Sequence, residues 1–114
     1  MKSYDKNYEL DGRTIVLRAD LTDCGLQVLI AGGNLSHIGA VSIADPAGKI
    51  ETITFPGHKE TIVAEKYARK LYEVMKVPIV VSAGIHYDKI TKEGIADVLE
   101  VTDTLLEELI RWAE

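Results

Sequence analysis

The sequence has a single cysteine and lacks any long apolar run. One cysteine, Cys24, excludes an internal disulfide and is typical of proteins in a reducing cytoplasm. A transmembrane helix would need about 18 consecutive apolar residues, and the chain offers no such run. Met1 and Lys2 lead into polar residues without the apolar core of a signal peptide. We therefore expect a cytoplasmic protein that does not enter a membrane.

Positive charge is scarce as well. The chain carries 13 Lys and Arg against 18 Asp and Glu, a formal net charge of −5. This balance argues against nucleic-acid binding, which requires a basic face. The length of 114 residues, with 46% hydrophobic and 27% charged residues, is typical of one soluble unit with a substantial core. We expect a single domain spanning residues 1–114.

Alternation of apolar and polar residues dominates the first half of the chain. In residues 13–21 the apolar side chains take every second position, the period of a strand with one buried face. Strong turn signals separate such segments at Asp11-Gly12 and at Asp45-Pro46. Small residues in the fourth segment indicate close packing against a neighbour. Strands are expected over residues 4–10, 13–21, 24–31, 38–44 and 49–55.

After residue 57 the apolar period changes to that of a helix, which is expected over residues 59–76. Residues 77–85 are almost continuously apolar, as in a strand buried on both faces. A second helix is expected over residues 92–113, with Thr91 as its N-cap; Thr102 interrupts its apolar stripe, so a kink is allowed there. Strands grouped before helices predict an α+β fold, with two main helices covering one face of a largely antiparallel sheet of about six strands.

The junction at residues 55–60 is a candidate anion site. A helix start offers unpaired backbone N–H groups and the positive end of the helix dipole. Gly57 permits close backbone approach, and His58 and Lys59 add donors and positive charge. Phosphates are often bound at such junctions. The alternative is an ordinary Pro-Gly turn that leads into an ordinary first helical turn.

The three histidines, His37, His58 and His86, all fall at the ends of predicted elements, where binding sites concentrate. Three interpretations compete. Each histidine can simply satisfy a loop carbonyl; the three can bind a metal such as zinc, with Glu60 or Asp88 as the base of a metal-dependent hydrolase; or they can help to bind an anionic ligand. The hairpin between the fourth and fifth strands puts His37 and His58 at one sheet edge, and His86 joins them in one of two strand orientations.

Three segments resemble a known family: residues 37–41 (HIGAV), 57–60 (GHKE) and 83–91 (AGIHYDKIT). They are similar to the small D-subunit family of gallate- and protocatechuate-type decarboxylases, described as prenylated-flavin chaperones. The resemblance implies a non-catalytic protein that binds prenylated flavin mononucleotide (FMN) and helps to deliver it to a prenylated-flavin-dependent decarboxylase. It also implies an α+β fold similar to the small proteasome-assembly chaperones, which tend to dimerise.

The resemblance carries over as cofactor-binding positions His37, Gly57, His58, Lys59 and His86. Lys59 and the amides near Gly57 are expected to bind the phosphate, and the histidines to line the ring or ribityl side. The ring's expected neighbours are Ile38, Ile85 and Tyr87. We also expect a homodimer, with Trp112 in the core or at the subunit contact. The rival functions are the three-histidine hydrolase and an assembly scaffold without a small-molecule site.

Overall fold

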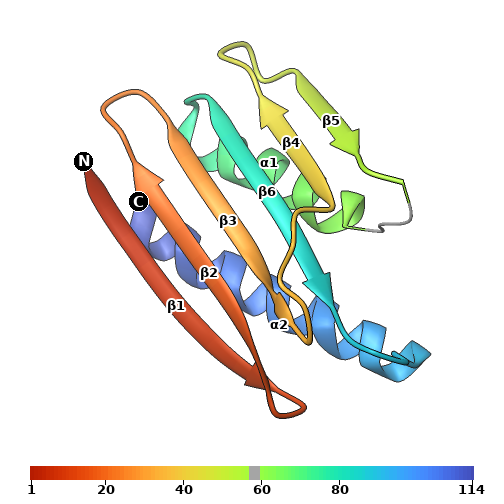
Figure 1. Cartoon of the computed structure of the whole chain (residues 1–114). Coiled ribbons are helices and arrows are strands. Elements are labelled where there is room, and N and C mark those ends of the chain that lie inside the picture. The colour runs from red at the N-terminus through yellow and green to blue at the C-terminus, as the bar shows by residue number, and fades with distance from the viewer. Residues whose placement is uncertain (57–59) are drawn as a thin grey trace.

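The computed structural model describes residues 1–56 and 60–114. It has an α+β fold, as predicted, with six strands and two helices (Figure 1). In chain order the elements are β1 (Lys2–Leu10), β2 (Arg13–Leu21), β3 (Leu26–Gly33), β4 (Ala40–Ala44), β5 (Ile50–Thr54), α1 (Thr61–Met75), β6 (Ile79–His86) and α2 (Lys92–Ala113).

The strands form one sheet in the order β1-β2-β3-β6-β4-β5. β3 and β6 pair in parallel, whereas the other neighbouring pairs are antiparallel, which confirms the largely antiparallel sheet. β6 is inserted between two strands that precede it in the sequence. Because β3 and β5 run in the same direction as β6 and β4 runs in the opposite direction, the carboxyl ends of β3, β5 and β6 lie at the same end of the sheet as the start of β4 (Figure 1).

Both helices cover the same face of the sheet (Figure 1). Alternate residues of each central strand point toward them, as the two-residue period predicts. Apolar burial of these side chains against the helices is the main stabilising contribution to the fold. Fully buried side chains of the core include Ile15, Leu17, Val28, Ile30, Ala64, Tyr67, Leu71, Ile79, Val81, Leu105 and Leu109.

Side-chain contacts connect α1 to the middle of α2. The buried Tyr67 hydroxyl of α1 donates a hydrogen bond to the Thr102 carbonyl at 2.5 Å, and Lys66 pairs with Asp103 at 2.7 Å. The Thr102 hydroxyl turns back to donate to the Leu99 carbonyl. This threonine is therefore satisfied inside the helix, and α2 runs without interruption where its sequence allows a kink.

Element boundaries differ from the prediction at a few ends. β1 begins at Lys2, two residues earlier than expected, and β4 begins only at Ala40. Trp112 packs against Tyr4 of β1, with ring centroids 5.2 Å apart. It was expected either in the core or at a subunit contact, and in the structure it packs against the core. Neither described helix is long and apolar enough to cross a membrane.

Candidate functional site

Two of the three histidines meet at the sheet edge where β6 ends. His37 lies in the loop between β3 and β4, and His86 is the last residue of β6. Their ring centroids are 6.5 Å apart, with ring planes 75° apart. The strand directions explain this meeting, because β4 starts at the edge where β6 ends. His58, together with Gly57 and Lys59, lies outside the described residues.

The backbone of β6 holds the loop that carries His37. The His37 N–H donates to the Gly84 carbonyl, and the Gly39 N–H donates to the Ala83 carbonyl. A Cβ at Gly84 would overlap the His37 carbonyl group. Gly84 is therefore required for this close approach, and the loop lies beside the end of β6, next to the residues of β6 that pair with β4.

His37 is paired with a carboxylate from the start of α1. Its Nε2 lies 3.0 Å from Oε1 of Glu60, and both side chains are mostly buried. Its Nδ1 faces the Leu35 carbonyl at 3.3 Å. Both ring nitrogens of His37 therefore face oxygen atoms, one from its own loop and one from the start of α1.

His86 has its own carboxylate partner. Its Nε2 lies 3.0 Å from Oδ1 of Asp88, and this pair is more exposed. Asn34 fastens the turn that follows β6: its N–H donates to the His86 carbonyl, and its side-chain oxygen accepts from the Asp88 N–H. The sequence identified Glu60 and Asp88 as candidate bases of a hydrolase, but it gave no signal for the role of Asn34.

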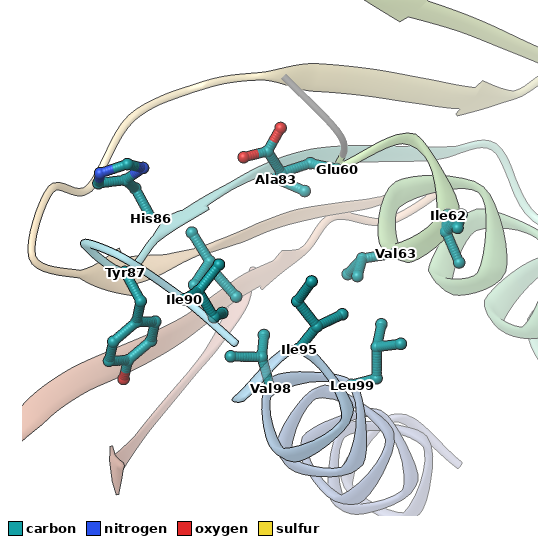
Figure 2. Close-up of a pocket in the computed structure, with 11 residues that line it drawn as sticks. Glu60, Ile62, Val63, Ala83, His86, Tyr87, Ile90, Ile95, Val98 and Leu99 are labelled. Atoms are coloured by element: carbon teal, nitrogen blue, oxygen red, sulfur yellow. The ribbon is translucent and has the colours of Figure 1, made fainter. Parts of the chain in front are cut away.

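A cavity of about 430 Å³ opens beside these pairs on the helix side of the sheet. Figure 2 shows Ile62 and Val63 of α1 on one side, Ile95, Val98 and Leu99 of α2 below, and His86 and Tyr87 at the far end. The complete described lining is Glu60, Ile62, Val63, Ala83, Ile85, His86, Tyr87, Ile90, Ile95, Val98 and Leu99. An apolar hollow with a few polar groups at one side is the usual form of a small-molecule site.

Tyr87 fixes one end of the cavity. Its hydroxyl donates to the Leu10 carbonyl at 2.8 Å, which joins the end of β6 to the turn between β1 and β2. Partial burial, and then the carboxylates of Asp11 and Glu9, raise the pKa of this hydroxyl, while Arg13 opposes the shift. The phenol therefore remains protonated at neutral pH and acts as a hydrogen-bond donor.

Of the residues expected around the ring, Ile85, His86 and Tyr87 line the cavity, whereas His37 and Ile38 are not among the described lining residues. The sequence did not indicate that α2 contributes to the cavity. Ile95, Val98 and Leu99 belong to the apolar stripe of this helix, yet they line the cavity. No group of three residues able to hold a metal ion occurs within residues 1–56 and 60–114. The three-histidine metal site therefore depends on His58.

The family profile described as prenylated flavin chaperone LpdD-like domain matches residues 9–114. The chain belongs to this family. Protein LpdD of Lactiplantibacillus plantarum is 31% identical over 94 residues, which cover 78% of this chain and 69% of that protein. Membership of the prenylated flavin chaperone family supports a chaperone role.

The fold has a counterpart among solved structures. A chain from the crystal structure of a chaperone complex for yeast 20S proteasome assembly superposes with a TM-score of 0.66. The match covers 95% of this chain and 94% of that chain, at 16% sequence identity. This likeness confirms the expected similarity of fold to the proteasome-assembly chaperones.

Proposed function

We propose that this chain, acting as one domain, is a non-catalytic chaperone that binds prenylated FMN and assists its delivery to a prenylated-flavin-dependent decarboxylase. The observation that carries the proposal is the apolar cavity beside the converged His37 and His86 in a member of the prenylated flavin chaperone family. A cofactor carrier needs such a hollow, open enough for release.

We assign the phosphate to Gly57, His58 and Lys59, and the histidines His37 and His86 to the ring or ribityl side. Support comes from the start of α1, where Glu60 makes no side-chain cap bond and the first turn carries no acidic residue. The amides at this end can therefore serve an anion. The carboxylate of Glu60, which lies close by, is paired with His37.

Delivery requires release, so we expect modest affinity, about micromolar, which corresponds to about 8 kcal/mol. We further propose that the chain works in the cytoplasm, where its exposed free thiol, Cys24, stays reduced. Its partner is a decarboxylase that receives the loaded cofactor.

We also propose a homodimer formed through the sheet face opposite the helices. No described helix or strand covers the sheet face opposite the helices. The registers put Val80 opposite Ile43 and Val41 opposite Ile53 on this face, and Val16 and Leu29 lie on the same face of β2 and β3. A second copy of the chain presents the same residues, and sheet faces pack well on each other. Light scattering should give a dimer at high micromolar concentration, and the double variant Ile43→Lys, Ile53→Lys should be monomeric; a monomeric wild type would contradict this.

The binding test is calorimetric titration of prenylated FMN into wild type, Lys59→Ala and His58→Ala. Loss of a charged contact to the phosphate should weaken binding roughly ten- to a hundredfold, about 1.5–3 kcal/mol. Lys49→Ala is the matched control, because Lys49 is exposed and pairs only with Glu51 in the part of the chain described. Absence of binding to wild type would refute the chaperone function, and unchanged binding by both variants would refute the phosphate assignment.

Metal analysis of the purified protein separates the rival functions. A stoichiometric transition metal that is lost in His58→Ala would favour the hydrolase. A protein that binds neither metal nor flavin would favour the assembly scaffold. Transfer is tested by adding the loaded chaperone to a cofactor-free decarboxylase of the class, where faster activation than with free cofactor is expected.

A further inference from the structure

The cavity is lined mainly by branched aliphatic side chains rather than by aromatic rings. Ile62, Ile95, Val98 and Leu99 face it from the two helices (Figure 2). Tyr87 supplies the only phenol ring of the described lining. Planar conjugated rings are bound best by flat aromatic neighbours. A saturated, branched group of carbon atoms instead matches an aliphatic wall, where its burial is favourable in proportion to its area.

Several of these side chains are unusually exposed for aliphatic residues. Ile62 is 68% exposed, Ile95 47% and Ile90 41%. They come from three separate segments, yet all three line the same cavity. Apolar surface gathered around a hollow marks a place where something apolar binds.

The charged residues of the lining determine the orientation in which an amphiphilic ligand binds. Glu60 contributes a carboxylate to the cavity wall, and the described lining contains no lysine or arginine. A phosphate inside the cavity would therefore have no lysine or arginine of the described lining to pair with, in surroundings where an unpaired charge is costly. An amphiphilic ligand is bound with its apolar part inside and its phosphate outside.

Resting on the proposed function, we propose that this cavity is a subsite for the saturated, isoprenoid-derived part of prenylated FMN. The prenyl group is what distinguishes this cofactor from plain FMN, so the subsite makes the chain select the modified flavin. Each methylene removed from water favours binding about fourfold, so partial burial of the added carbons should give a preference of roughly 10- to 100-fold.

The test compares two ligands rather than one. Reduced prenylated FMN and reduced FMN are titrated under anaerobic conditions, and the ratio of their dissociation constants is measured for each variant. Ile95→Gln removes an aliphatic wall residue at an exposed helical position, and Val98→Thr places a hydroxyl in the wall without changing its volume. Val74→Gln is the matched control, because Val74 is a helical aliphatic residue of similar exposure, 42%, outside the cavity lining.

The wild type should prefer the prenylated cofactor, and both cavity variants should lower the ratio roughly three- to tenfold, about the effect of one or two methylenes. Val74→Gln should keep the wild-type ratio. Folding damage alone changes both affinities together and leaves the ratio unchanged. Equal wild-type affinity for the two flavins, or a ratio unchanged in both cavity variants, would overturn the subsite while leaving the chaperone function standing. Failure of the wild type to bind prenylated FMN would overturn both.

Discussion

The two halves of α2 carry similar apolar patterns but use them differently. In the C-terminal half, Val101, Leu105 and Leu109 are buried in the core. In the N-terminal half, before Val101, no residue is buried, and Ile95 and its neighbours face α1 and the end of β6 across a cavity. An amphipathic repeat thus predicts a helix and its apolar face, but not whether that face meets a sheet or a ligand.

The largest effect should be the difference in unfolding free energy between substitutions in the two halves of α2. Leu105→Ala removes a fully buried side chain and should cost about 2–5 kcal/mol of unfolding free energy, because it leaves a cavity in the core. Ile95→Ala should cost less than about 1 kcal/mol, because that side chain is already half exposed. Urea denaturation of both variants measures the difference. Similar losses would contradict the division of α2.

The next effect concerns the close backbone contact between Gly84 of β6 and the loop that carries His37. Gly84→Ala should cost about 1–3 kcal/mol, because the new methyl group would overlap the His37 carbonyl and force the loop away from β6. The histidine NMR signals of His37 should shift as its pairing with Glu60 is disturbed. Gly25→Ala is the control, since its nearest contact would be 3.3 Å from the Pro78 carbonyl. Equal effects of the two substitutions would show that the close approach at Gly84 is unimportant.

A smaller effect is expected at the boundary between the halves. Tyr67→Phe removes the bond to the Thr102 carbonyl and should cost about 1 kcal/mol at neutral pH. Burial, and secondarily Asp103, raise the pKa of the Tyr67 hydroxyl well above its usual 10.0. The folded state therefore holds this proton more tightly than the unfolded state, so stability is lost as the pH rises above about 10.

Tyr67→Phe should reduce this alkaline loss without abolishing it, because the pKa of Tyr87 is also raised. The free energy of unfolding is measured by urea denaturation at several pH values from 7 to 11. If the variant and the wild type lose stability equally at high pH, Tyr67 does not carry this dependence.

The smallest effect should come from the exposed ion pair at the same boundary. Lys66→Ala removes the pair with Asp103, in which both side chains are roughly half exposed. Exposed pairs contribute about 0–1 kcal/mol and are screened by salt. The variant should match the wild type in urea at high salt. A loss comparable to that of Leu105→Ala would mean that surface charge rather than burial joins the helices.

Much of the fold could be predicted because local periods were clear. The two-residue alternation of β2 and the helical repeat of α1 indicated each element and its buried face. Sheet order could not be predicted, because the insertion of β6 beside β4 depends on pairing between distant residues. The small residues of β4 did signal a close neighbour, and Ala40 is indeed buried opposite Ala83.

The candidate site was only partly predictable. The sequence placed His37 and His86 at element ends, and the direction of β6 then decided that they meet. The pairing of each histidine with a carboxylate depends on contacts between distant segments. The cavity depends on the position of α2 relative to α1 and β6, which the apolar pattern of α2 does not encode. The assignments of Gly57, His58 and Lys59 stay predictions.

The central claim is that prenylated FMN binds in the cavity formed by the N-terminal half of α2, the start of α1 and the end of β6. Isoleucine methyl NMR tests it directly, because Ile62, Ile85, Ile90 and Ile95 line the cavity while Ile43 and Ile53 lie on the opposite sheet face. On titration with prenylated FMN, the methyl signals of the four cavity isoleucines should shift and those of the two sheet-face isoleucines should not. Shifts confined to Ile43 and Ile53 would contradict the account.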